Sequence, residues 1–258
     1  MLLAVDVGNS ETVIGLFENP PNHELVDHWR VSTNTERTSD EMALLVQEFL
    51  AFHGFSFDTD IAGVAVCSGV PRVTAALRKM SERYFGFPAV VLEAGVKTGM
   101  PILYDNPKEV AADRIANAVG ALEMYDPPII IVDFSSTATI FDAISAKAEY
   151  LGGTIMPGVE VSLDALVGRA AMLRRVELVE PRSVIGRSTV ESIQSGVVHG
   201  IGAMVDGVVE RVTREIGEAT VVSTGRLAEL MAPFTESIEH VEPWLTLQGL
   251  RIIFEKNK

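Results

Sequence analysis

Two stretches of the chain repeat one pattern of residue types that could bind a phosphate chain. Residues 2–10 form an apolar run that ends at Asp6, followed by small residues and a hydroxyl. About half a chain length later, residues 129–137 form a second apolar run that ends at Asp133, again before small and hydroxyl residues. A tight turn of small residues exposes backbone N–H groups that surround an anion, and an aspartate at a strand end can hold Mg²⁺ through water. The two turns predict a binding site for a nucleotide polyphosphate. We prefer this interpretation to one of two ordinary buried hairpins because the two copies match.

Composition narrows the class of protein. A chain of 258 residues with 47% apolar content can bury a full core in one or two domains. The net charge of −14 argues against a nucleic-acid partner, because phosphate neutralisation needs clusters of Lys and Arg, and the densest basic pair is Arg174-Arg175. Neither a basic amino-terminal segment nor a run of about 20 apolar residues is present. We therefore expect a cytoplasmic protein without a membrane or nucleic-acid partner.

The single cysteine, Cys67, excludes an intrachain disulfide framework and a cysteine-rich metal site. It lies in an apolar, strand-like run at 63–68. Free cysteines are usually buried, so we expect an inert thiol in the core.

The elements that would position the first turn alternate between strands and helices. After the amino-terminal hairpin we expect a strand at 27–32 and a helix that begins at the capping box of 38–41. A buried strand at 61–68, a helix from about Pro71 and a strand at 89–92 follow. This alternation predicts a mixed α/β architecture.

Further elements position the second turn. An Asn-Pro-Lys-Glu start at 106–109 predicts a helix that carries Asp113 one turn further in. The Pro127-Pro128 pair suggests a domain boundary, giving domains 1–126 and 127–258. Beyond it we expect a helix over 162–173 and a long helix after a capping box at 188–191. Four glycines in the long helix indicate close approach by another helix or a ligand, or an interruption.

At this point the ordered motifs resemble the type III pantothenate kinase family nearly from end to end. The stretches that carry the resemblance are Asp-Val-Gly-Asn-Ser at 6–10, Gly-Val-Lys-Thr-Gly at 95–99, Tyr-Asp-Asn-Pro at 104–107, Ala-Asp-Arg-Ile-Ala-Asn at 112–117, Gly-Gly…Pro-Gly at 152–158 and Leu-Thr-Leu-Gln-Gly-Leu at 245–250. The resemblance implies two related actin-like (ribonuclease H-like) domains with a nucleotide cleft between them, the last segment packing back on the first domain. It also implies ATP-dependent phosphorylation of pantothenate, the first step to coenzyme A. The implied cofactors are ATP, Mg²⁺ and a monovalent cation (K⁺ or NH₄⁺), and the implied assembly is a homodimer.

The resemblance also implies roles for individual residues. Asp113 matches the general base for the attacking hydroxyl, and Arg114 the partner of the pantothenate carboxylate. Asp6 is expected to orient Mg²⁺–ATP, and Asp133 to lie at the monovalent cation. The residues expected at ATP are Asp6, Val7, Gly8, Asn9, Ser10, Glu11, Thr12, Val13, Ser136 and Thr137. Those expected at pantothenate are Tyr104, Ala111, Ala112, Arg114 and Ala170.

The chain departs from the family pattern at several of these places. Ala111 and Ser135 replace glycines, Ala170 replaces a threonine, and Arg226 replaces the second glycine of a Thr-Gly-Gly stretch on the adenosine side. If the turn at Ser135 requires a positive φ, serine bears a strain that glycine avoids. The departures leave open a catalytically weak homologue that binds nucleotide or pantothenate as an accessory protein. They also leave open a kinase of the same fold that acts on another small hydroxylated acid.

Overall fold

The computed structural model describes residues 1–170 and 176–258, and the chain forms two compact units. The first unit comprises residues 1–99, 106–120 and 246–258, and the second comprises residues 100–105 and 121–245. Neither unit is one contiguous half of the chain, and the division at 126/127 stays a prediction. The Arg174-Arg175 pair and the carboxyl end of the helix predicted over 162–173 lie outside the described residues.

The first unit is built on a five-stranded mixed sheet with the order β3-β2-β1-β4-β5. Its strands are β1 (Leu2–Val7), β2 (Glu11–Phe17), β3 (Leu25–Ser32), β4 (Gly63–Ser68) and β5 (Val90–Val91). The central strand β1 pairs antiparallel with β2 and parallel with β4, and in the second pairing Asp6 lies beside Cys67.

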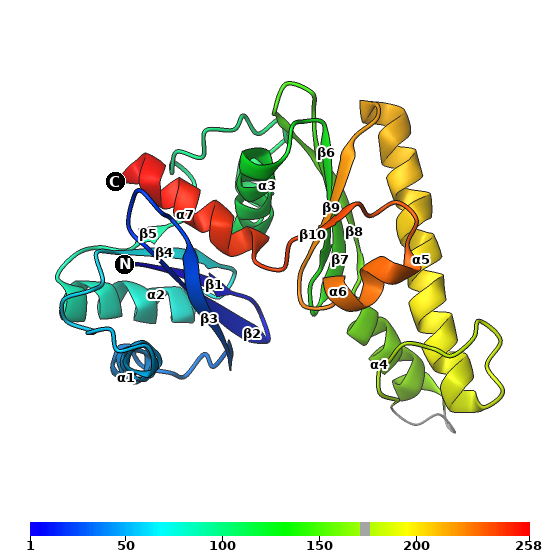
Figure 1. Ribbon diagram of the computed structural model, residues 1–258, viewed down its shortest axis with the longest axis horizontal. Helices are drawn as coiled ribbons and strands as arrows, with labels where there is room; N and C mark the ends of the chain where they lie inside the picture. Colours follow the sequence, from blue (N-terminus) through cyan, green and yellow to red (C-terminus); the bar gives the residue numbers. More distant parts are fainter. Residues whose placement is uncertain (171–175) are drawn as a thin grey trace. The chain divides into compact units, whose positions relative to one another are not determined.

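Helices cover both faces of this sheet. The helices α1 (Ser39–Phe52) and α2 (Pro71–Met80) lie together on one side (Figure 1), where they bury Leu3, Val5 and Val66. On the other side is α7 (Leu245–Asn257), whose Phe254 ring occupies the space that a Cβ at Gly63 would need. Since side chains alternate along a strand, Asp6 and Cys67 point to the α7 face. The capping box at the start of α1 is confirmed in both of its hydrogen bonds.

The prediction that a helix begins at residue 106 is wrong. The Asn106 side chain accepts a hydrogen bond from the Lys108 N–H and caps a short 3₁₀ turn, η2 (Pro107–Glu109). Val110 then adopts an extended conformation and is buried, and α3 (Ala112–Met124) begins two residues later. The extended backbone at Val110 interrupts the helical path, so Asp113 lies in the first turn of α3 instead of one turn inside a helix.

A second five-stranded mixed sheet, with the order β10-β9-β6-β7-β8, forms the second unit. Its strands are β6 (Ile129–Phe134), β7 (Ala138–Ile144), β8 (Tyr150–Pro157), β9 (Thr220–Thr224) and β10 (His240–Val241). As in the first unit, the strand ending in an aspartate pairs antiparallel with the next strand and parallel with a later one. The repeat seen in the sequence is therefore a repeat of topology.

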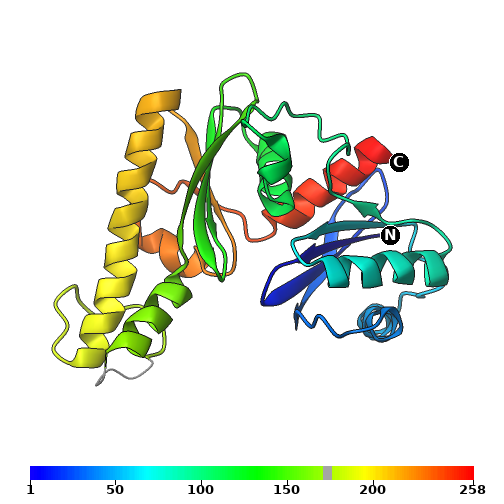
Figure 2. The same ribbon diagram turned by 180° about the vertical axis from the view of Figure 1, so that it is seen from behind.

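A long helix covers one face of this second sheet. The long helix α5 (Thr189–Ile216) runs along one face (Figures 1 and 2), where Val205 and Val209 pack on Ile130 and Val132. Asp133 points to the opposite face. The shorter elements of the unit are α4 (Val159–Arg169), α6 (Ala228–Met231) and η3 (Ala232–Phe234); a π-helix, η1 (Ser81–Phe85), follows α2 in the first unit.

The glycines of α5 do not interrupt it. A Cβ at Gly202 would collide with the Phe234 carbonyl oxygen of η3, so that glycine allows the close approach predicted from the sequence. The capping box predicted for α5 is half formed: Ser188 accepts from the Glu191 N–H, but the Glu191 carboxylate accepts from the Arg187 N–H instead of that of Ser188.

Two composition-based expectations can be compared with the described residues. Cys67 is a free, buried cysteine, as predicted. Among the helices of residues 1–170 and 176–258, none has the length and apolar character needed to cross a bilayer.

Candidate active site

The turn after β1 has the form expected of an anion-binding loop. The Gly8 N–H donates to the Glu11 carbonyl oxygen over 2.9 Å, which closes the turn and leaves Gly8, Asn9 and Ser10 exposed. Thr33, which follows β3, also stabilises the turn. Its hydroxyl donates a hydrogen bond to the Gly8 carbonyl over 2.7 Å, and its N–H donates one to the Ser10 carbonyl over 2.9 Å. The turn is thus held in place before any ligand binds.

Other residues expected at ATP lie beneath or beside this turn. The Thr12 hydroxyl is buried and shares a 2.9 Å hydrogen bond with the Thr33 hydroxyl, and Val7 is buried in the core. Glu11 forms an ion pair with Arg30 over 3.4 Å. Of these side chains, Thr12 supports the turn through Thr33 and Glu11 reaches the surface.

Asp6 lies at the carboxyl end of β1 with an unusual environment for a carboxylate. Its pKa is raised to about 7, chiefly by loss of hydration and next by the nearby negative charge of Asp113. The Cys67 thiol donates a hydrogen bond to Asp6, which partly opposes this rise. The pKa of Cys67 is itself raised well above its ordinary value by burial and by both carboxylates, so the thiol keeps its proton.

Asp113 occupies the first turn of α3, where the helix dipole favours a negative charge. Its Oδ1 accepts a 2.8 Å hydrogen bond from the Arg114 N–H. Asp113 is half-buried, whereas the Arg114 side chain is 4% exposed. Ala111 is exposed and Ala112 half-buried at the same helix start. The structure therefore brings Asp6 and Asp113 together in one unit.

The corresponding turn of the second unit is closed by Ser135. Its hydroxyl donates to the Ala138 carbonyl over 2.9 Å and accepts from the Ala138 N–H over 3.4 Å. Among the described non-glycine residues, positive φ occurs at His23 and Ala148. The strain expected at Ser135 is therefore absent, because serine closes this turn with its side chain at a negative φ. Ser136 is half-buried and Thr137 exposed.

Asp133 is 6% exposed at the end of β6 and is covered by the loop after β9. Gly225 in that loop has φ +91°, and a Cβ there would lie 2.5 Å from Asp133 Oδ1. Across residues 1–170 and 176–258, no cluster of three or more His, Cys, Asp or Glu side chains could hold a metal ion. A cation at Asp6 or Asp133 would need backbone carbonyls, water or a ligand's oxygens as its other donors.

The remaining residues expected at pantothenate lie elsewhere in the second unit. The Tyr104 ring packs over Gly152, where a Cβ would lie 3.1 Å from Tyr104 Cε2, and its centroid is 6.5 Å from that of Tyr150. Ala170 follows α4, with its N–H donating to the Leu166 carbonyl. Their contact with a substrate stays a prediction.

Sequence reasoning missed three interactions around these turns. They are the support of Gly8 by Thr33, the hydrogen bond from Cys67 to Asp6 and the ion pair of Arg226 with Glu160. Each joins residues far apart in the chain, so local spacing carries no signal for them. For the Arg226–Glu160 pair, the replacement of the family's glycine by Arg226 was the one signal in the sequence.

Solved structures with similar backbones define the class of fold. One is component A of the Acidaminococcus fermentans (R)-2-hydroxyglutaryl-CoA dehydratase, with TM-score 0.57, 14% identity and coverage of 100% of this chain and 99% of that one. Another is the ADPNP-bound activator of the Clostridium difficile 2-hydroxyisocaproyl-CoA dehydratase, with TM-score 0.55, 12% identity and coverage of 99% and 95%. A propionate kinase from Francisella tularensis has TM-score 0.53, 10% identity and coverage of 97% and 98%. The chain has the two-domain α/β fold of the actin-like kinases and ATPases, which confirms the expected class.

Sequence comparison is more specific. The family model described as "Type III pantothenate kinase" matches residues 2–211. Curated proteins of that name are 51% identical in Streptomyces coelicolor, covering 100% of this chain and 98% of the relative, and 50% identical in Thermobifida fusca, covering 100% of both. The chain belongs to the type III pantothenate kinase family.

Proposed function

We propose that the protein transfers the γ-phosphoryl group of ATP to a hydroxyl of pantothenate, with Asp113 as the general base. The observation that carries the proposal is full-length identity of about 50% to curated type III pantothenate kinases. The charge of Asp113 acting on Asp6 supports it from the structure. None of the comparisons favours an accessory protein.

Phosphoryl transfer requires positioning and charge neutralisation more than covalent chemistry. We assign Asp6 to Mg²⁺, held through water, and the N–H groups of residues 8–10 to phosphate oxygens. Asp113 would accept the proton of the pantothenate hydroxyl, and the first turn of α3 holds it in place for that step. Arg114 would bind the pantothenate carboxylate as a bidentate donor, and Tyr104, Ala111, Ala112 and Ala170 would line that site.

In the second unit we assign the turn at 135–137 to the phosphate chain and Asp133 to the monovalent cation. Asp133 supplies one hard oxygen ligand beside a turn rich in backbone carbonyls, a donor set that suits K⁺ or NH₄⁺. The Gly225 backbone lies against Asp133 and would restrict access to it from one side.

We also propose a homodimer that uses the face formed by α4 and α5. Among residues 1–170 and 176–258, Cβ atoms at Gly196 and Gly200 would have no neighbour within 4 Å, so no described residue packs against α5 at these two positions. It borders a hollow of about 450 Å³ in which the side chains of Leu166, Ile193 and Val197 take part. Gly200→Arg should yield a monomer in light scattering, while Glu215→Arg, at the exposed carboxyl end of α5, should leave a dimer. A monomeric wild type would contradict the proposal.

The activity is tested by measuring ADP release from ATP in the presence and in the absence of pantothenate. Turnover with Mg²⁺–ATP that requires pantothenate is the expected result, with the protein in the soluble cytoplasmic fraction of the cell. ATP consumption that ignores pantothenate but responds to another hydroxylated acid would contradict the substrate assignment.

A further inference from the structure

Arg226 is a basic residue where the family pattern has glycine, and its side chain has a defined partner. It forms an ion pair with Glu160 in the first turn of α4. The two side chains are 35% and 34% exposed, so both remain accessible to a ligand from solvent. Surface ion pairs contribute little to stability, so the loss of this pair should leave the fold intact in the variants used below.

The pair joins two segments that meet at one edge of the second sheet. Strands β6 and β9 are parallel, and Asp133 lies beside Thr224, so the loop carrying Arg226 leaves the sheet where the turn at 135–137 begins. A Cβ at Gly225 would lie 2.7 Å from the Phe134 carbonyl oxygen. The loop therefore packs directly against the start of the proposed phosphate turn.

The other segment, the start of α4, lies at the end of the same turn. The Gly158 N–H donates to the Thr137 carbonyl over 3.0 Å, and a Cβ at Gly158 would lie 2.9 Å from the Thr137 carbonyl carbon. Glu160 is two residues further along. Arg226 and Glu160 thus connect the two segments that flank the turn at 135–137.

We propose that Arg226 binds the phosphate chain of the nucleotide and that Glu160 holds the Arg226 guanidinium at this edge when the site is empty. This inference rests on the proposed function, because it places Arg226 in the ATP site assigned above. A guanidinium has five N–H donors, so it can contact a carboxylate and a phosphate together. The negative charge of Glu160 weakens phosphate binding while its oxygens orient the guanidinium.

The ligand atoms that Arg226 contacts can be identified by comparing nucleotides with a nucleoside. The full-length protein is titrated calorimetrically with ATP, ADP and adenosine. Arg226→Ala is expected to weaken ATP and ADP about tenfold and to leave adenosine unchanged, because adenosine has no phosphate. Arg226→Lys should recover part of the affinity, since it keeps the charge and loses the bidentate geometry.

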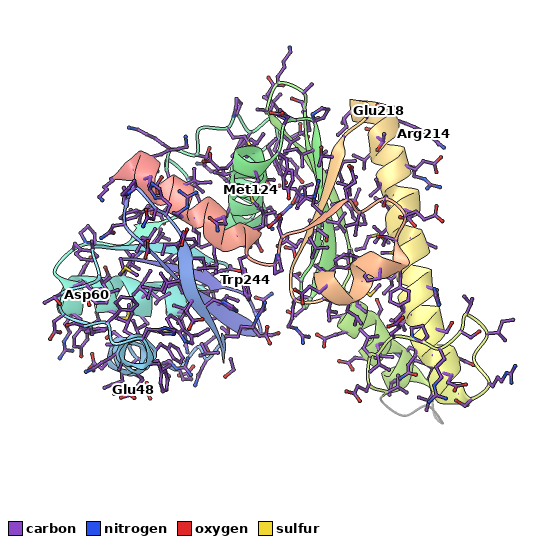
Figure 3. All side chains as sticks on the ribbon, in the orientation of Figure 1. Glu48, Asp60, Met124, Arg214, Glu218 and Trp244 are labelled. Carbon is purple, nitrogen blue, oxygen red and sulfur yellow. The ribbon has the colours of Figure 1, made fainter. Side chains whose placement is uncertain are left out.

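A matched control separates this role from the loss of any surface ion pair. Arg214 lies near the carboxyl end of α5 in the same unit (Figure 3) and pairs with Glu210, and both side chains are more than 60% exposed. Arg214→Ala should bind all three ligands like the wild type. Glu160→Gln should bind ATP and ADP several-fold more tightly, since the amide oxygen still accepts from Arg226 but the competing charge is gone.

The possible results separate this inference from the proposed function. Unchanged ATP and ADP affinity in Arg226→Ala, or an equal loss for adenosine, would overturn the phosphate contact. Weaker ATP binding in Glu160→Gln would overturn the role of Glu160. Phosphate-dependent loss in Arg226→Ala, in a protein without pantothenate turnover, would uphold the contact and reject the kinase; a wild type that binds no nucleotide rejects both.

Discussion

Asp6 and Asp113 lie close enough in the first unit for the charge of Asp113 to raise the pKa of Asp6. Asp6 is the penultimate residue of β1, and Asp113 is the second residue of α3, more than a hundred positions later. Repulsion between two carboxylates is tolerated in a folded site where a cation or a transferred proton can relieve it. We propose that this pair takes part directly in phosphoryl transfer.

Asp113→Asn should lower kcat by about 10²–10⁴-fold while ATP binding persists, because the amide cannot accept the hydroxyl proton. Steady-state kinetics and calorimetric ATP titration measure the two quantities. Glu123→Gln, an exposed change on the last turn of α3, is the matched control and should keep wild-type kcat. Near-normal turnover of Asp113→Asn would remove Asp113 from the role of base.

The stability of the metal-free protein should fall as the pH rises from about 4 to about 7. Folded Asp6 has a pKa of about 7 against an ordinary value of 3.8, so over this interval the folded state holds a proton that the unfolded state has lost. The stabilisation is complete below pH 4, is lost through pH 7 and amounts to at most about 4 kcal/mol.

Denaturant unfolding in buffer with a chelator, compared between wild type and Asp6→Asn, isolates this contribution. The stability of the wild type relative to the variant should decline across the interval. A difference that stays constant from pH 4 to pH 8 would show that the Asp6 pKa is not raised.

Cys67→Ala should raise the pKa of Asp6 further, because the thiol hydrogen bond favours the ionised carboxylate. The shift can be followed by carboxyl-carbon NMR of Asp6 in metal-free buffer. Cys67→Ser keeps a hydroxyl donor and should stay closer to the wild type. An unchanged Asp6 pKa in Cys67→Ala would mean that the hydrogen bond is absent in solution.

Gly225→Ala should destabilise the protein more than Gly217→Ala does. Both glycines have a positive φ, +91° and +90°, so an added Cβ is strained at either position. At Gly225 the added Cβ also meets Asp133, whereas at Gly217 it meets nothing within 4 Å. The difference in free energy of unfolding therefore measures the packing of the loop on Asp133, and equal losses would argue against that packing.

Local patterns in the sequence predicted the elements that carry the first turn. The capping box at Thr38 and the helix start at Pro71 are encoded by neighbouring residues, and the structure confirms both. The buried thiol of Cys67 followed from the apolar run around it. These features depend on nearby residues, so a single sequence contains their signal.

Other features depended on contacts that a local pattern does not encode. The stretch at 106–109 suits the start of either a 3₁₀ turn or an α-helix, and in the structure it ends as a 3₁₀ turn at the extended Val110. The register that sets Asp6 beside Cys67 joins two strands that are separated in the chain by β2, β3 and α1. The pairing of Arg226 with Glu160 likewise required the sheet to be assembled first.

The central claim is that this chain phosphorylates pantothenate. The most direct test measures ADP release from Mg²⁺–ATP by the wild-type protein with and without pantothenate, in K⁺ and then in Na⁺ buffer, beside Asp113→Asn. We predict turnover that requires pantothenate, is faster in K⁺ and is lost in Asp113→Asn. Folded wild-type protein that binds ATP yet shows no pantothenate-dependent turnover in either buffer would contradict the claim.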